Sequence, residues 1–157
     1  MLDAMDIKIL DLLQKDCTMA VADVGKAVGL STTPCWRRIQ KLESDGVIKA
    51  RVALINPNAI NAGLTVFIAI STGEHSIQWL ERFNAVVQTF PEIIEAYRIS
   101  GESDYMLRIA VPDIQRFDEF YRKFISRIEV KNVTSSFAVE QVKFTTALPL
   151  KFAGVRD

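Results

Sequence analysis

A short segment of the chain carries the side-chain types that bind DNA. They are hydroxyl-bearing, aromatic or basic: Thr32, Thr33, Trp36, Arg37, Arg38 and Lys41. Hydroxyl and indole groups near the start of a helix can reach base edges, whereas guanidinium and ammonium groups bind bases or phosphates. We therefore expect the first three residues to meet base edges and the three basic residues to contact bases or phosphates. Alternatively, the basic residues form only a solvated helix face, and Trp36 packs in the core.

The apolar spacing predicts the helix that would position these side chains. Cys35, Ile39 and Leu42 recur at i, i+4 and i+7, which gives one buried stripe. Ser31 can cap the helix, and Pro34 falls in the first turn, where its missing N–H costs least. A preceding amphipathic helix carries its apolar residues on one side: Val21, Val24, Ala27 and Val28. A glycine between the two helices permits a sharp turn, so the pair is predicted to be a helix-turn-helix.

A first helix and a β-rich segment complete the predicted N-terminal domain. Asp3 can cap the first helix, whose inner stripe is Met5, Ile9, Leu12 and Leu13. Residues 47–55 are rich in β-branched side chains and suit a strand or wing, from which Lys49 and Arg51 would contact the DNA backbone. Because an Asn-Pro-Asn run follows, we predict a winged helix-turn-helix domain over 1–56 and a linker over 57–63.

The remainder, residues 64–157, alternates strand-like and helical patterns and is predicted to be a second domain. The strand patterns cover 64–72, 93–100, 105–111 and 133–142, and the helical patterns cover 76–90 and 117–128. The order β-α-β-β-α-β is that of the ferredoxin-like split motif, so we predict the α+β class. Helices of that motif cover one sheet face only. An apolar second face would need another layer, which a symmetric dimer would supply.

The composition is that of a folded chain without net charge. Of its 157 residues, 49% are hydrophobic, and the formal net charge is zero. A sizeable core is therefore available, and DNA binding needs a local basic patch rather than a globally basic protein. Residues 31–51 supply such a patch, because the basic residues there outnumber the acids: Arg37, Arg38, Lys41, Lys49 and Arg51 against Glu43 and Asp45.

Cysteine, histidine and hydropathy patterns argue against several other classes. Cys17 and Cys35 are too few for a disulfide framework or a zinc site, and Cys35 is expected in the core. The single histidine, His75, cannot build a typical metal site, and no nucleophile motif accompanies it. No stretch is long and apolar enough to span a membrane, and Met1 opens on a capped helix rather than a signal peptide. We therefore expect a cytoplasmic protein.

These features together resemble the Lrp/AsnC family of bacterial and archaeal transcription factors, the leucine-responsive and asparagine regulators. The resemblance covers nearly the whole chain. Its most specific part is the run Gly-Leu-Ser-Thr-Thr-Pro-Cys over residues 29–35. The other runs that carry it are 2–16, 38–43, 46–48, 56–57, 101–105 and 139–143.

The resemblance implies an N-terminal winged helix-turn-helix and a C-terminal ligand-binding domain that pairs through its sheets. Dimers of that family typically assemble further into rings, commonly octamers. A free amino acid binds where dimers meet and alters assembly or DNA affinity. The implied effector is leucine, methionine or another amino acid, with no further cofactor. The implied partners are double-stranded DNA, the effector and other copies of the chain, without a membrane.

The run 101–105 is a candidate effector site. Turn chemistry alone favours a tight hairpin there, whereas the resemblance favours ligand binding. Asp104 could accept the ammonium group of an amino acid. Backbone N–H groups of the turn, with hydroxyls of a neighbouring strand, could bind its carboxylate if that strand edge lies close. The residues expected to contact the effector are Gly101, Ser103, Asp104, Tyr105, Thr134, Ser135 and Ser136.

The leading hypothesis is a sequence-specific DNA-binding transcriptional regulator that responds to an amino acid bound at a subunit interface. A small metabolic enzyme with a ferredoxin-like catalytic domain is the rival from another class. The sequence lacks a phosphate loop, a metal cluster and a nucleophile–base pair, which argues against it. A DNA-compacting architectural protein that ignores ligands is the third possibility, and it would bind DNA without sequence preference.

Overall fold

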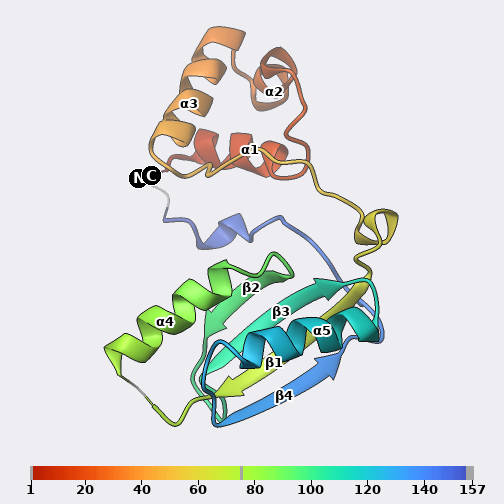
Figure 1. The fold of residues 1–157 in the computed structure, drawn as a ribbon. Helices are drawn as coiled ribbons and strands as arrows, with labels where there is room; N and C mark the ends of the chain where they lie inside the picture. The colour runs from red at the N-terminus through yellow and green to blue at the C-terminus, as the bar shows by residue number, and fades with distance from the viewer. Residues whose placement is uncertain (1, 75, 155–157) are drawn as a thin grey trace. The chain divides into compact units, whose positions relative to one another are not determined.

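The computed structural model describes residues 2–74 and 76–154 and divides the chain into two compact units (Figure 1). Unit 1 is Met1–Ala53 together with Val142–Asp157, and unit 2 is Leu54–Gln141. The domain division drawn from the sequence placed all of residues 64–157 together. The structure differs, because the chain after residue 141 returns to unit 1. His75 lies outside the described residues.

The described part of unit 1 contains three α-helices, α1 (Ala4–Leu13), α2 (Val21–Val28) and α3 (Thr32–Ser44). Asp3 caps α1 as predicted, in a capping box in which Asp3 and Asp6 each accept the other's backbone N–H. Ser31 precedes α3 as its N-cap residue, but its side chain makes no capping hydrogen bond. The helix-turn-helix prediction is confirmed, and so is the buried stripe of α3.

The turn between α2 and α3 depends on two glycines. Gly29 has φ 79°, a left-handed conformation that favours glycine. Gly25 is buried, and a Cβ there would lie only 2.9 Å from the carbonyl oxygen of Leu30. Gly25, rather than the exposed Ala27, therefore completes the inner side of α2. The core of this unit is made of Ile9, Leu10, Leu13, Val24, Val28, Cys35, Ile39 and Leu42.

The segment after α3 differs from the predicted strand or wing. Residues 47–56 form irregular chain without a strand in this part of the described structure. Its apolar side chains Val52, Leu54 and Ile55 are exposed. A strand needs a neighbouring segment for its ladder, and the β-branched composition of 47–55 supplies only propensity. The short 3₁₀ helix η1 (Pro57–Ile60) follows.

The C-terminal segment of unit 1 docks against α1. The side-chain amide of Gln14 donates from Nε2 to the carbonyl oxygen of Leu148 at 3.2 Å and accepts the Leu148 N–H at 2.9 Å. Leu150, at the start of the 3₁₀ helix η2 (Leu150–Phe152), packs against the core of the unit. A largely apolar cavity of about 400 Å³ lies between this segment, α1 and residues 47–51.

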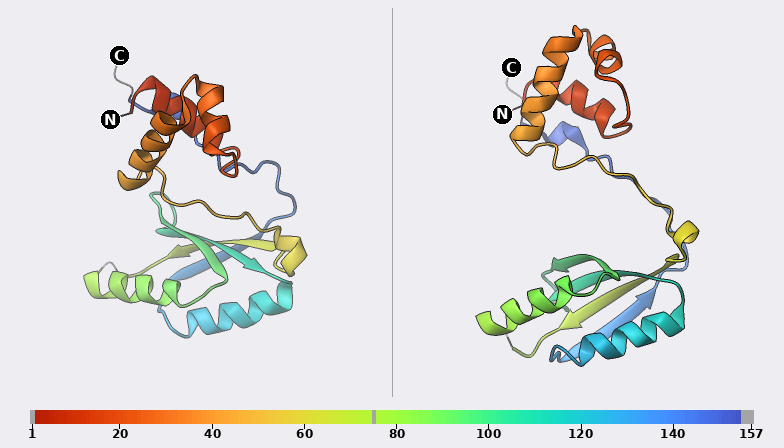
Figure 2. Two further views of the ribbon diagram at one scale, coloured as in Figure 1. Left: turned by 90° about the horizontal axis from the view of Figure 1, so that it is seen from above. Right: turned by 45° about the horizontal axis from the view of Figure 1, so that its top comes forward.

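Unit 2 is the predicted ferredoxin-like domain. Its elements are β1 (Leu64–Ser71), α4 (Ile77–Gln88), β2 (Ile93–Arg98), β3 (Tyr105–Val111), α5 (Ile114–Ile125) and β4 (Asn132–Phe137). The strand order is β2-β3-β1-β4, with every neighbouring pair antiparallel. Helices α4 and α5 cover the same face of this sheet, as both views of Figure 2 show. The α+β class and the β-α-β-β-α-β order are therefore confirmed.

The two faces of the sheet differ in burial. Val66, Ile68 and Ile70 alternate with Phe67 and Ala69 along β1, and the first three are fully buried beneath the helices. The opposite face, which we call the open face, carries Phe67 at the centre of the sheet with 40% exposure. Within the described ranges no helix is both long and apolar enough to cross a bilayer.

Candidate nucleic-acid interface and ligand site

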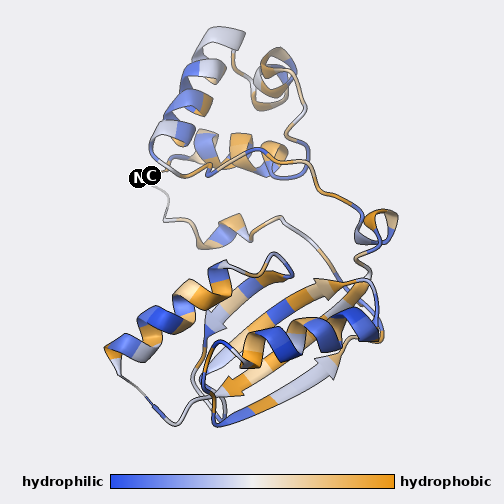
Figure 3. Ribbon diagram, viewed as in Figure 1, coloured by the Kyte–Doolittle hydropathy of each residue, from blue (hydrophilic) through white to orange (hydrophobic). Residues whose placement is uncertain are grey.

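The side of α3 opposite its buried stripe carries exposed polar residues. We call this set the exposed strip: Thr33, Arg37, Gln40 and Ser44. These residues follow one another at i, i+4, i+7 and i+11, so they share one side of the helix. Blue bands recur along α3 in Figure 3 because of its polar content. Such a side can offer hydroxyl, guanidinium and amide groups to a DNA groove.

Other residues predicted to bind DNA flank the exposed strip. Thr32, Lys41 and Lys49 are exposed, and Trp36 is 50% exposed. Trp36 is therefore not packed in the core, which was one of its two alternatives. Its indole lies on the accessible side of α3, where an aromatic edge can contact a base or sugar.

Two of the predicted DNA contacts are engaged by acids of their own chain. Arg38 lies 2.6 Å from Oδ2 of Asp3 and 2.7 Å from Oδ1 of Asp6, measured from its Nη1 atom. Nε and Nη2 of Arg51 both donate to Oε1 of Glu43, at 3.1 and 2.8 Å. Carboxylates of the same unit therefore already engage both guanidinium groups.

Gln40 is the residue of this face that the sequence analysis did not single out. It is exposed, and its Nε2 donates to Oε2 of Glu43 at 2.9 Å. Its position could have been predicted from the sequence. Cys35, Ile39 and Leu42 define the buried side of the helix, and Gln40 falls on the opposite side. Gln40 carries no charge, so the distribution of basic residues does not indicate it.

The turn between β2 and β3 is held firmly against the end of β1. Asp104 donates its backbone N–H to Ile70 at 2.9 Å, and its Oδ2 accepts the Thr72 N–H at 2.8 Å. Ser71 also donates its hydroxyl to the Glu102 carbonyl at 3.2 Å. The Asp104 carboxylate is thus a structural acceptor for Thr72, which is only 6% exposed.

The tip of this turn offers hydrogen-bond donors to solvent. Among the described residues, the backbone N–H groups of Gly101, Glu102 and Ser103 have no hydrogen-bond partner. Gly101 has φ 145°, a conformation that favours glycine. Successive unpaired N–H groups of this kind can bind a carboxylate. The neighbouring Glu102 side chain is exposed and provides an acceptor that could serve an ammonium group.

The other residues expected at the ligand site lie elsewhere in unit 2. Tyr105 is buried among the aromatic rings under α4, with its ring centroid 4.4 Å from that of Phe83. Thr134 and Ser136 lie on the open face, opposite Ala69 and Phe67 of β1, and Ser135 lies on the helix-covered side, opposite Ile68. The structure therefore brings Gly101, Ser103 and Asp104 together in one turn but separates them from the three hydroxyl residues of β4. These three come from the middle of that strand.

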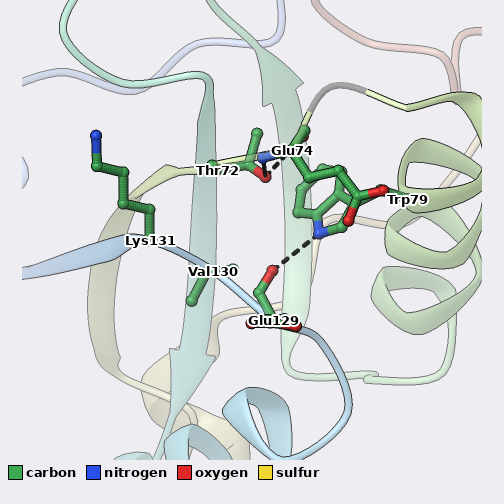
Figure 4. Close-up of a pocket in the computed structure, with 7 residues that line it drawn as sticks. Thr72, Glu74, Trp79, Glu129, Val130 and Lys131 are labelled. Carbon is green, nitrogen blue, oxygen red and sulfur yellow. Dashed lines mark hydrogen bonds between the residues drawn. The ribbon is translucent and has the colours of Figure 1, made fainter.

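A separate cavity of about 340 Å³ lies beside Thr72, between the β1–α4 and α5–β4 connections. In Figure 4 the Trp79 indole borders it and donates from Nε1 to the Glu129 carbonyl oxygen at 2.8 Å. The Glu74 N–H donates to the Thr72 hydroxyl at 3.0 Å. The Lys131 ammonium group points away from the indole in that view. The cavity therefore has an aromatic wall and a tightly bonded rim.

Comparisons with known proteins agree with both units. The AsnC-type helix-turn-helix domain matches residues 2–43, and the Lrp/AsnC ligand binding domain matches residues 65–148. The DNA-binding transcriptional activator DecR from Escherichia coli (strain K12) is 47% identical over 152 residues, which cover 96% of this chain and 100% of DecR.

Solved structures resemble the whole chain. An AsnC family transcriptional regulator from Agrobacterium tumefaciens has a TM-score of 0.94 and 57% identity, covering 97% of this chain and 99% of its own. A transcriptional regulator from Neisseria meningitidis in complex with L-Met has a TM-score of 0.91 and 35% identity, covering 96% and 97%. The protein described here is therefore a member of the Lrp/AsnC family of transcriptional regulators.

Proposed function

We propose that the exposed strip of α3 enters the major groove of an operator and reads its sequence. The observation that carries this proposal is the position of Thr33, Arg37 and Gln40 on the side opposite the buried stripe. An arginine can pair with guanine and a glutamine with adenine, each through two hydrogen bonds. Trp36 and Thr32 would contact the groove beside the strip.

Lys41 and Lys49 supply the phosphate contacts in this proposal. Both are exposed, and neither forms an ion pair within the described residues. A contact with phosphate releases counterions, so binding should weaken as salt is added. Arg51 contributes less than the sequence suggests, because Glu43 holds its guanidinium.

We propose that a free amino acid regulates this binding from the turn of unit 2. The unpaired N–H groups of residues 101–103 would donate to its carboxylate, and the Glu102 carboxylate would accept from its ammonium group. Asp104 then keeps the turn in shape. The neisserial relative was solved with L-Met, and a relative from Escherichia coli (strain K12) is a leucine-responsive regulatory protein. Methionine and leucine are therefore the first effectors to test.

We further propose that two copies pair through the open faces of their sheets, and that dimers assemble into an octamer. The exposed Phe67 at the centre of the open face supports pairing. The effector would lie at a junction between subunits, where it alters assembly or DNA affinity. In this proposal the protein works in the cytoplasm and catalyses no reaction.

Selection from fragmented genomic DNA tests the function. The protein is expected to enrich a small set of fragments with a shared sequence, and their affinity should change with one of the twenty amino acids. A thermal-shift screen identifies that amino acid, because a ligand of the native state raises apparent stability. Enrichment without a shared sequence, unchanged by any amino acid, would favour an architectural protein.

A further inference from the structure

Arg38 joins two helices that are far apart in the sequence. From α3 it reaches the start of α1, where its Nη1 atom contacts Asp3 and Asp6 at 2.6 and 2.7 Å. Only 16% of the Asp6 side chain and 35% of the Arg38 side chain are exposed. Water therefore screens this contact less than it screens a fully exposed ion pair.

The two carboxylates are fixed by the capping box of α1. The Asp6 N–H donates to Asp3 at 2.8 Å, and the Asp3 N–H donates to Asp6 at 3.1 Å. The hydrogen bond from the Asp6 N–H, together with the Arg38 guanidinium, lowers the pKa of Asp3. The two carboxylates raise the pKa of Arg38. The pKa shifts of Asp3 and Arg38 both favour their charged forms, and Arg38 contacts both carboxylates.

We infer that Arg38 is a positioning residue, which holds α3 against the start of α1 and does not contact DNA itself. The inference rests on the proposed function of α3. A guanidinium suits this role because its planar, rigid donors can serve two carboxylates at once. To reach a phosphate, Arg38 would have to give up both partners. Base reading requires α3 to be held in one orientation, which this three-residue network provides.

If this network positions α3, neutralising its acids should change DNA affinity in the direction opposite to that expected from charge repulsion alone. Removing acids from a DNA-binding unit ordinarily tightens binding, because repulsion of the phosphates decreases. If Asp3 and Asp6 hold Arg38 in place, neutralising them loosens α3 and weakens binding. Asn can replace Asp in both capping hydrogen bonds, so the charge can be removed while the start of α1 keeps its cap.

The test uses the full chain and the tightest fragment from the genomic selection. The variants are Arg38→Met, the double variant Asp3→Asn/Asp6→Asn, and the control Arg37→Met on the exposed strip. Thermal unfolding is measured for each, and DNA affinity is measured over a series of salt concentrations. Arg38→Met and the double Asn variant should both lower the melting temperature and weaken binding by roughly fivefold.

The salt dependence separates positioning from contact. Arg38→Met should keep the wild-type slope of log affinity against log salt, whereas a lost phosphate contact makes that slope shallower by about 0.9. Arg37→Met should leave the melting temperature unchanged. Tighter binding by the double Asn variant, or a shallower slope for Arg38→Met at an unchanged melting temperature, would overturn the inference. Wild-type protein that binds no fragment would instead refute the proposed function of α3, and the role of Arg38 with it.

Discussion

The exposed strip of α3 combines three chemistries within a few helical turns. Thr33 offers a hydroxyl, Arg37 a guanidinium and Gln40 an amide, and all three are exposed. The neighbouring Arg38 has the same charge as Arg37 but lies beside two acids. Adjacent arginines on one helix therefore have different surroundings, because a step of one residue turns the side chain by about 100°.

Gln40 provides the sharpest test of base reading. Gln40→Ala should abolish discrimination at one A·T pair of the operator, at a cost of about 1–3 kcal/mol for the lost bidentate contact. Affinity for unrelated DNA should not change, because an amide carries no charge. Selection of operator sequences by the wild type and the variant measures the effect. Gln78→Ala, an exposed residue of α4, is the control, and identical sequence preferences for all three proteins would show that Gln40 reads nothing.

Two substitutions of Asp104 distinguish a structural role of its carboxylate from a ligand-binding role. Asp104→Ala should destabilise unit 2 by about 1–3 kcal/mol, because the buried Thr72 N–H loses its acceptor. Asp104→Asn keeps an acceptor oxygen and should retain most of that stability. Urea unfolding and calorimetric titration with the effector decide between the roles. Normal stability with lost effector affinity in Asp104→Asn would assign the carboxylate to the ammonium group instead.

Helices and strands whose patterns are local could be predicted from the sequence. The stripe Cys35, Ile39 and Leu42, the Asp3 cap and the alternation of β3 all depend on neighbours within a few residues. The strand predicted over 47–55 failed because pairing depends on a partner segment. The ion pairs of Arg38 likewise depend on residues more than thirty positions away. Composition alone gives no signal for such contacts.

The C-terminal segment is the largest feature of the fold that the sequence did not reveal. Residues 142–154 carry no strong helical or strand period, and two hydrogen bonds to Gln14 hold Leu148. Gln14 lies at the end of α1, so it meets the segment beside the core of unit 1. The segment thus gives unit 1 a second covalent connection to unit 2, in addition to residues 47–56.

Gln14→Ala should release this segment. Each lost hydrogen bond contributes about 0.5–1.5 kcal/mol, and both are exposed, so unit 1 should lose modest stability and remain folded. Limited digestion with trypsin should cleave after Lys143 and Lys151 faster than in the wild type. Gln78→Ala again serves as the control for an exposed glutamine. Equal digestion rates in all three proteins would show that Leu150 and the apolar cavity hold the segment without Gln14.

At the scale of the whole molecule, the open face of unit 2 is the surface through which we propose that two copies pair. Phe67 lies at its centre, flanked by Arg108 of β3 and Ser136 of β4. Arg108 pairs with Glu95 across the neighbouring strands. An exposed aromatic side chain in such a position is typical of the centre of a protein interface. A two-fold axis near Phe67 would bring two copies of the ring together and bury both.

Phe67→Lys should therefore convert the assembly into monomers. Burying one large apolar side chain contributes about 1.5–3 kcal/mol, and symmetry doubles the loss. The substitution also places two ammonium groups beside each other at the axis. Ile114→Lys, at an exposed position of α5, should leave assembly unchanged. Light scattering measures the mass of each protein at micromolar concentration.

If monomeric Phe67→Lys still bound the effector with wild-type affinity, the ligand site would be complete within one chain. Loss of both properties together would instead mean that the effector is held between subunits, so that assembly and response depend on the same surface.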